Sequence, residues 1–439
     1  MLMKRTTLAL IALLGPLLAA SAAVAQTRPA WGRIALFGSG STTTRDDGPT
    51  STLGELVANI TFESAAGDDV RFDYRADIRL AGYTGEGDRP TRVSLYDAYA
   101  GVRLRGGTVG IRAGQMWVND LGGLGSVGGG MVEFAQRKRP GRGGWRAAAF
   151  GGFEPRIQEA GYVDNVTKFG GLVAYQGAGM RRHVAGFVHI RDEGMTERSV
   201  LSFTNYLPIG KQVFVYQAAE YDLAGPGIPN TGALTYFFAN GRVVVNRWLE
   251  MQGLYHHGRS IDSRSIVRDQ LDGRPIDPKA LDGLRFESVT GRVTLSLGRH
   301  LRLFGGYGQD RNNRDDEASG RLSYGVYASN VLRTGIDVTF WDSRIDRGTK
   351  GGYDSWYVSV GRSFGSRVYL TGDYSSSLSV YRFTSATGFT IETQPTTRRL
   401  AFSGVLNLTR SISILVTGER VLFDDGAQTR MLSGLTWRF

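Results

Sequence analysis

Apolar and polar residues alternate along most of the chain, from Trp31 to the C-terminal Phe439. The clearest example is 70–80 (VRFDYRADIRL), where every second residue is apolar and the residues between them are Arg or Asp. A period of two is the pattern of a β-strand with one apolar and one polar face. No segment after the leader shows the apolar spacing of an amphipathic helix, so the sequence predicts an all-β chain.

The connections between the predicted strands alternate between short and long. Tight turns are predicted at 106–107, 299–300, 365–366 and 410–411. The longer polar connections are 40–50, 83–91, 261–283, 311–318 and 384–396. This alternation is typical of an up-and-down meander in a membrane, with short turns at one rim and long loops at the other.

The pattern divides into about 22 strands, with a range of roughly 18 to 24, because 108–165 and 196–247 divide less clearly. A closed barrel is the β-structure that leaves no unpaired edge in lipid. We therefore expect a transmembrane antiparallel up-and-down β-barrel over 26–439, without a plug domain, since only a few residues precede the first strand. A secreted sandwich or propeller is the alternative, with its charged faces toward outside solvent.

The leader, residues 1–25, is the one long apolar run. Lys4 and Arg5 precede an apolar core, and Ala23-Val24-Ala25 follows it. This order predicts a secretory signal peptide cleaved before Gln26. The alternative is an N-terminal membrane anchor, which the short run and its Pro16 disfavour. The chain has no cysteine, which excludes disulfides and thiolate metal sites.

The last strand, 427–439, places Met431, Leu435, Trp437 and Phe439 on one face. A chain that ends on Phe after alternating aromatic and aliphatic residues resembles bacterial outer-membrane β-barrel proteins. The resemblance implies that Leu435, Trp437 and Phe439 form the signal read by the barrel-assembly machinery. It also implies the outer membrane of a Gram-negative bacterium, with lipid and lipopolysaccharide as surroundings. The hairpin 93–117 is similar to early hairpins of porin-like families, although an ordinary hairpin explains it as well.

The charge balance is basic, with 52 Lys+Arg against 41 Asp+Glu and a formal charge of +11. Nucleic-acid binding would gather these cations on one face, whereas here they alternate along strands with acidic residues. By strand parity, we expect one set of charged residues to face the lumen. This predicted pore-lining set is Arg71, Asp73, Arg75, Asp77, Arg79, Asp97, Arg103, Arg112, Arg292, Arg302, Arg321, Asp337 and Arg367. Its basic excess predicts a weak anion preference, unless the arginines are neutralised by acids on neighbouring strands.

Two segments are candidates for narrowing the lumen. The glycine-rich stretch 118–130, with six glycines between 122 and 130, fits either a constriction inside the lumen or a mobile loop at the rim. The rim is the expectation, because loops usually lie at the surface. The second segment is the loop 261–283.

Enzymatic chemistry has little support in the sequence. His183 and His189 share an inward parity, but six residues separate them by roughly 20 Å along a strand, too far to bind one metal. The segment 261–283 offers candidate partners for His256, namely Asp262, Ser263 and Asp269. The acidic stretch 310–317 lacks the glycine-centred spacing of a calcium loop. We expect no enzyme, no cofactor and no metal site.

The predicted function is a passive outer-membrane pore for small hydrophilic or anionic solutes. Without a plug, a barrel of this size is wide, so loops, side chains or a partner must narrow it. The competing hypothesis is a structural barrel that sheathes a periplasmic partner in an electron-transfer or secretion complex. An outer-membrane enzyme is a second alternative. The sequence names neither the solute nor the oligomeric state.

Overall fold

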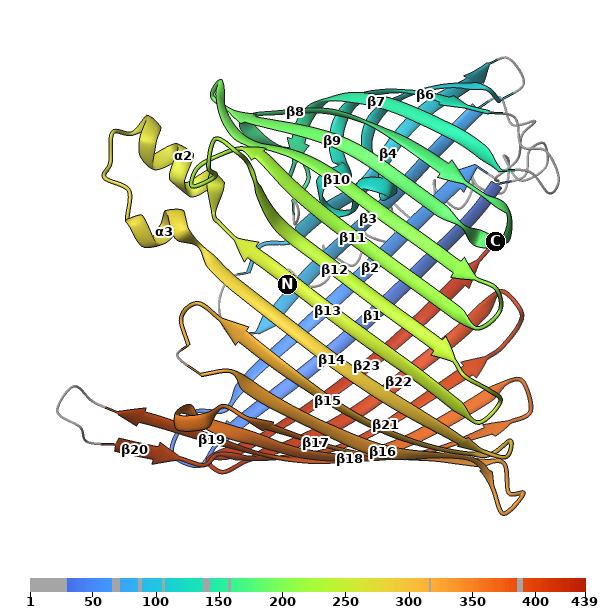
Figure 1. The fold of residues 1–439 in the computed structure, drawn as a ribbon. Coiled ribbons are helices and arrows are strands. Elements are labelled where there is room, and N and C mark those ends of the chain that lie inside the picture. The colour runs from blue at the N-terminus through green and yellow to red at the C-terminus, as the bar shows by residue number, and fades with distance from the viewer. Residues whose placement is uncertain are drawn as a thin grey trace.

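The strands of the computed structural model form one closed antiparallel sheet (Figure 1). Strand β1 pairs with β2 on one side and with β23 on the other, which closes the sheet into a barrel. Twenty-two strands form the barrel, which confirms the predicted fold class and strand number. The described residues are 30–64, 72–85, 89–104, 107–136, 143–156, 159–315, 317–384 and 390–439. The predicted signal peptide and Arg71 lie outside them.

The strands follow one another around the barrel in chain order. Their bounds are β1 Ala30–Arg45, β2 Ser51–Ser64, β3 Phe72–Gly85, β4 Arg92–Leu104, β5 Val109–Trp117, β6 Ser126–Ala135, β7 Gly144–Pro155, β8 Tyr162–Gln176, β9 Arg182–Asp192, β10 Met195–Ile209, β11 Val213–Ala224, β12 Ala233–Val244, β13 Leu249–Ser260, β14 Leu284–Leu297, β15 Leu301–Asn312, β16 Ser319–Val331, β17 Ile336–Asp346, β18 Gly351–Phe364, β19 Val368–Thr384, β20 Thr390–Thr393, β21 Thr396–Asn407, β22 Ile412–Phe423 and β23 Gly426–Arg438. The short β20 was not predicted; it pairs with the end of β19 and extends that hairpin beyond the rim.

The two ends of the barrel differ in their connections. The end that holds Ala30 and Phe439, called here the short-turn end, has turns such as 298–300, 365–367 and 408–411. The opposite, long-loop end carries the longer predicted segments, including 261–283. The alternation is therefore as predicted, although the tight turns 193–194 and 424–425 also lie at the long-loop end.

Two short helices that the sequence analysis missed lie within the loop 261–283. Helix α2 (Ser263–Leu271) begins after Asp262, whose carboxylate accepts a hydrogen bond from the Ser265 amide, and α3 (Pro278–Asp282) begins after Asp277 in the same way. These are ordinary N-cap arrangements, so the local signal was present in the sequence. No helix among the described residues is long and apolar enough to cross a membrane.

The outer surface of the barrel is apolar, and aromatic residues lie toward both of its ends. Near the short-turn end, Trp145 contacts Tyr175, and Trp437 contacts Phe439. Toward the long-loop end, Phe153 contacts Tyr162. Apolar residues between the ends are strongly exposed. Examples are Ile111, Val173, Phe203, Val289, Leu322 and Phe402. Such an outer surface is stable only in lipid, where aromatic belts lie at the membrane interfaces.

The barrel also has a hydrophobic core inside it. A 3-10 helix, η1 (Asn119–Gly125), follows β5 and folds inward against β8 and β9. Its Leu121 and Leu124 are buried among inward-facing residues of strands β6 to β10. These partners are Val127, Met131, Ala148, Phe150, Val166, Leu172, Ala174, Val184, Val188, Ile190 and Val200. We call this side of the barrel, β6–β10, the covered wall, and the side formed by β14–β23 the open wall.

Candidate functional site: the lumen

A ladder of ion pairs begins on the inner faces of β2, β3 and β4. The Arg79 guanidinium lies 3.2 Å from Glu55, and that of Arg75 lies 3.1 Å from Glu63 and 3.3 Å from Asp97. Each pair joins residues on neighbouring strands, as alternate positions of an antiparallel sheet require. The arginines on this part of the wall are therefore held in place by carboxylates.

The ladder continues through β5, β6 and β7. Arg112 donates from Nε to Asp73 at 2.6 Å and approaches Glu133 at 3.8 Å, and Arg146 lies 2.8 Å from the same Glu133. Arg103 lies 3.4 Å from Asp73. The sequence left open whether the inward arginines are free or neutralised by acids on neighbouring strands. On this part of the wall they are neutralised. Seven predicted residues belong to the ladder: Asp73, Arg75, Asp77, Arg79, Asp97, Arg103 and Arg112.

A β-bulge in β4 positions Asp97. The register of β3 with β4 shifts between Asp77 and Ile78, where Tyr96 has no partner. The Asp97 carboxylate accepts a hydrogen bond from the Trp117 amide at 2.8 Å, and the Gln115 side chain donates to the Leu95 carbonyl. These bonds replace the backbone hydrogen bonds between strands that are lost at the bulge. β-Bulges commonly re-orient a side chain in this way.

Helix η1 joins the ladder through Asp120. The Asp120 side chain is only 1% exposed and pairs with both Arg146 and Arg182. Next to it, Leu121 lies over Gly186, where an added Cβ would lie 2.2 Å from the leucine side chain. Gly122 has φ +55°, which glycine adopts without strain. The segment is thus fixed by charge on one side and by apolar packing on the other.

This placement corrects the expectation that the glycine-rich stretch is a rim loop. Residues 119–125 lie inside the barrel, and Gly128, Gly129 and Gly130 belong to β6. The physical reason is that Leu121 and Leu124 find an apolar surface on the inner wall and exclude water from it. The glycine-rich stretch therefore narrows the lumen from inside, which is the alternative that the sequence left open.

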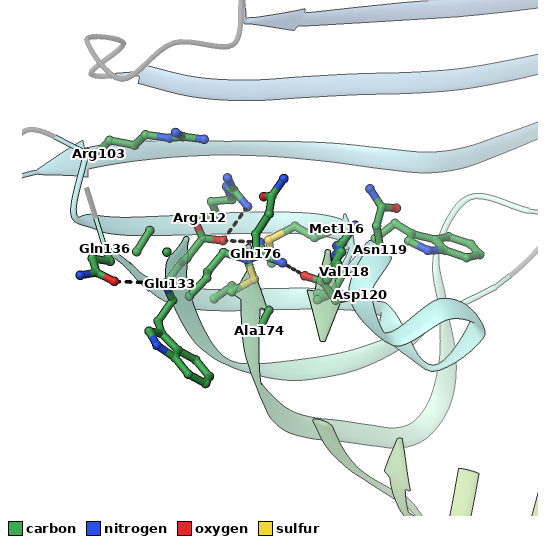
Figure 2. A pocket seen from close by; sticks show the side chains of 18 of the residues that line it. Arg103, Arg112, Met116, Val118, Asn119, Asp120, Glu133, Gln136, Ala174 and Gln176 are labelled. Carbon is green, nitrogen blue, oxygen red and sulfur yellow. Dashed lines mark hydrogen bonds and ion pairs between the residues drawn. The ribbon is translucent and has the colours of Figure 1, made fainter. Parts of the chain in front are cut away.

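Two cavities in the lumen lie beside η1. The first, of about 840 Å³, is lined by the ion-pair ladder together with Val118, Asn119 and Asp120 (Figure 2). In Figure 2, Arg112, Glu133 and Gln176 gather around it. The second, of about 670 Å³, is lined by Gly123 and Leu124 of η1 and by residues close to the long-loop end. Because η1 contributes to both linings, it separates the two cavities along this wall.

Helix α2 is fastened over the second cavity. Arg264 lies 3.1 Å from both Glu154 and Glu197, and Arg268 lies 3.1 Å from Asp192. Ile266 and Val267 are buried beneath the helix. Burial of the Arg264 guanidinium disfavours its charge, but the hydrogen bonds and charges of the two glutamates outweigh this and raise its pKa. The loop 261–283 is therefore held at the mouth by charged contacts.

The open wall carries fewer ion pairs and many hydroxyl groups. Register places Arg292, Arg302, Arg321 and Asp337 on its inner face. Arg321 pairs with Asp310 at 2.9 Å, and the Arg292 guanidinium lies 4.3 Å above the Phe304 ring. Among the described residues, Arg292 and Arg302 have no carboxylate partner. The hydroxyl groups on this face include Ser288, Thr290, Ser323, Ser359, Ser375, Ser377 and Ser403.

Arg367 differs from the predicted placement on the wall. It lies in the exposed turn 365–367 at the short-turn end, one residue before β19. Asp337 is also near that end, where its carboxylate accepts a hydrogen bond from the Asn330 amide at 2.9 Å. Both positions lie close to the short-turn end rather than midway along the lumen.

The C-terminal strand presents its predicted residues to the outside. Leu435 pairs in register with Leu36, and Trp437 pairs with Ile34, on the outer face of β1. Phe439 and Gly32 exchange two backbone hydrogen bonds of 2.9 and 3.0 Å, and the Phe439 ring covers Gly32. This strand therefore makes the final closure of the barrel.

The histidines give no catalytic or metal-binding grouping among the described residues. His183 and His189 point outward, against the predicted parity: the His189 ring lies 4.8 Å from Phe169, and His183 bonds to Asn205. Their strand turns its apolar face inward, under η1. The Nε2 atom of His256 is buried with no hydrogen-bond partner, and no group of three potential ligands that could hold a metal occurs in the described part of the chain.

Comparisons with known proteins add distant likenesses. Neither the family models nor the curated proteins match this sequence. Pseudomonas aeruginosa OpdQ is 8% identical over 93% of this chain and 98% of its own, with a TM-score of 0.43. The P pilus usher PapC translocation pore is 11% identical over 92% and 99%, with a TM-score of 0.47. P. aeruginosa OccK8 (OprE) is 11% identical over 93% and 98%, with a TM-score of 0.42. None is similar enough to indicate a function.

The geometry of the chain itself defines its class. A closed antiparallel barrel with an apolar outer surface, aromatic residues toward both ends and a polar lumen satisfies every backbone group in lipid. The chain is an outer-membrane β-barrel with a porin-like architecture, as the sequence predicts.

Proposed function

We propose that this barrel is a passive channel for small hydrophilic solutes, with a weak preference for anions. The observation that carries the proposal is the lumen wall: charged, amide and hydroxyl side chains face inward along the barrel, and η1 covers only one side of it. A barrel of this strand number is wide enough to retain an aqueous path beside such an insertion.

The anion preference rests on the arginines of the open wall. Most arginines of β2 to β7 are neutralised by carboxylates, whereas Arg292 and Arg302 have no such partner among the described residues. Uncompensated cations on a pore wall raise the local concentration of anions. The preference is weak because these cations are few and salt screens them.

The test is the reversal potential of the purified protein in a planar bilayer under a KCl gradient. The proposal expects a potential of the sign set by chloride, and a smaller value at high salt. A potential of the sign set by potassium would overturn the anion preference, while folded protein without conductance would overturn the channel.

Folded protein without conductance would favour the sheath around a periplasmic partner. Stoichiometric co-purification of a second protein in mild detergent would then support that function, and an outer-membrane enzyme would be the remaining alternative.

Export and assembly follow from the same proposal. Residues 1–25 serve as a cleaved signal peptide, and Leu435, Trp437 and Phe439 serve as the signal for the barrel-assembly machinery. The outer surface contacts lipid, with lipopolysaccharide around the long-loop end. Removing Phe439 should lower the yield of folded barrel in the outer membrane, which heat-modifiable gel migration measures; unchanged yield would contradict the role of the last residue.

A further inference from the structure

Five aromatic side chains form a continuous cluster on the inner face of β11 to β14. The Tyr216 ring lies 5.8 Å from Phe238, the Phe238 ring 5.9 Å from His256, and the His256 ring 4.8 Å from Phe286. Tyr236 lies 5.4 Å from His256 on the other side. We call these five residues the aromatic track.

The track runs obliquely over part of the lumen wall. Tyr216 is close to the turn 210–212 at the short-turn end, while Phe286 directly follows the loop 261–283 at the long-loop end. Tyr216, Phe238, His256 and Phe286 come from four successive strands, β11 to β14, so these rings advance across the sheet as they approach the long-loop end; Tyr236 is a second ring on β12. At the mouth, Tyr236 and Phe286 line the second cavity. The track therefore leads from that cavity toward the interior.

The rings line the lumen wall outside the hydrophobic core beneath η1. All five side chains are only partly buried, and they do not belong to the apolar cluster beneath η1. A group of neighbouring aromatic side chains on an otherwise polar, wet wall exposes apolar surface, and such surface commonly marks a ligand-binding groove. Packing of the barrel does not require a ring at every inward position, because Ser323, Ser343, Ser359 and Ser375 occupy the same face on β16 to β19, beside rings such as Trp341 and Tyr357.

The surroundings of the track favour a neutral ligand with apolar faces and hydrogen-bonding edges. The Gln252 amide donates to Asn240 at 3.2 Å, and Ser288 and Thr290 lie on the same face of the sheet. Of the nearby cations, Arg198 bonds to Asp222 and Glu220, and Arg242 bonds to Glu250. Arg292 is opposite Gln252 in register and has no carboxylate partner among the described residues, but its guanidinium lies over the Phe304 ring of β15, beyond the track.

An aromatic carboxylate would need a free cation beside the rings, whereas a sugar ring needs only aromatic faces and polar side chains. The charges near the track favour the sugar, because Arg198 and Arg242 are paired with carboxylates and Arg292 is stacked on Phe304.

We propose that the aromatic track binds carbohydrate and guides it along the lumen. This inference rests on the channel function proposed above, and it adds a ligand class to it. Sugar rings pack their C–H faces on the track while their hydroxyl groups exchange hydrogen bonds with Asn240, Gln252, Ser288 and Thr290. The ion pairs of Arg198 and Arg242 remain intact.

The test is current block in a planar bilayer by maltotriose, a neutral oligosaccharide, with benzoate as the comparison. We expect maltotriose to interrupt the current in a concentration-dependent way, and benzoate at the same concentration to leave it steady. Steady conductance without a maltotriose block, or a stronger block by benzoate, would overturn the carbohydrate track and leave the channel intact. Loss of all conductance from folded wild-type protein would instead overturn the channel itself.

Strand β12 offers a matched pair of variants. Phe238 points into the lumen and belongs to the track, whereas the adjacent Phe237 points outward and contacts Tyr255. Phe238→Ala should weaken the maltotriose block about three- to tenfold, whereas Phe237→Ala should not change it. Equal effects of the two variants would contradict the proposal. If Phe238→Ala does not fold, as judged by gel migration without boiling, Tyr216→Ala provides the same comparison.

Discussion

The covered wall and the open wall of this barrel are built by opposite rules. Along β14–β23, most outward residues are apolar and most inward residues are polar or glycine, as in Val289 and Ser288, although single apolar residues such as Phe304 also face the lumen. Along β8 and β9 both faces are apolar: Val173 and Phe187 point outward, while Leu172 and Val188 point inward beneath η1. The comparison teaches that a strand of a transmembrane barrel that loses its polar face has acquired a protein partner inside the lumen.

The largest difference between the two walls should be in stability, when a carboxylate is introduced on each wall. Val188 is 0% exposed, so Val188→Asp would bury a carboxylate without a partner and destabilise the fold by about 3 kcal/mol or more. Ser323→Asp, on the open wall, should change the stability by no more than about 0.5 kcal/mol, because that side chain faces water. Urea unfolding in detergent, followed by gel migration, measures both. Equal tolerance at the two positions would erase the distinction between the walls.

The next effect concerns the charge that holds η1. Asp120→Asn should weaken the contacts to Arg146 and Arg182 and destabilise η1 by roughly 1–3 kcal/mol, since it removes a buried charge from a paired network. We expect larger current fluctuations in single-channel recordings. Asp373→Asn on the open wall is the control, because an amide oxygen can still accept the 2.8 Å hydrogen bond from Tyr357. Fluctuations of the same size in both variants would show that Asp120 does not hold η1.

A smaller effect should appear in ion selectivity. Arg302→Gln removes an inward cation of the open wall and should shift the reversal potential toward the potassium side by a few millivolts. The outward Arg311 on the same strand provides the control, and Arg311→Gln should leave the potential unchanged. A shift with Arg311→Gln but not with Arg302→Gln would contradict the assigned faces of β15.

The smallest effect concerns helix α2 at the mouth. Arg264→Ala removes the contacts to Glu154 and Glu197 and should leave the barrel stability within about 1 kcal/mol, because these pairs are partly exposed. The loop 261–283 should become more sensitive to protease while the barrel remains intact. Arg285→Ala, whose pair with Asp282 is exposed, is the matched control. Unchanged cleavage in Arg264→Ala would show that the apolar contacts of Ile266 and Val267 hold the helix alone.

The sequence predicts the open wall well and the covered wall poorly. The segment 288–297 alternates strictly, so its inner and outer faces follow from residue parity alone. In contrast, the prediction that His183 and His189 point inward was wrong. It assumed that the apolar face of a strand always contacts lipid, whereas the apolar face of β9 lies inside the barrel, under η1. The sequence analysis missed that β8 and β9 carry apolar residues on both faces, which indicates that another apolar segment covers them inside the barrel. Leu121 and Leu124, in a glycine-rich segment nearby in sequence, cover these strands.

The caps of α2 and α3 were also readable from the sequence, through Asp262, Asp277 and Pro278. The docking of α2 was not, because it depends on Glu154, Glu197 and Asp192 meeting at one edge of the folded barrel. The same limit applies to the ion-pair ladder: parity assigns the charged residues to one face, but the partners follow from strand register and from the bulge in β4.

The central claim is that the lumen is a water-filled path partly occupied by η1. Single-channel conductance of the wild type and of a variant in which 119–125 is replaced by glycine and serine tests it most directly. The account predicts a steady conductance for the wild type and a clearly larger one for the variant, provided that both migrate as folded barrels. Equal conductances, or none from the folded wild type, would contradict it.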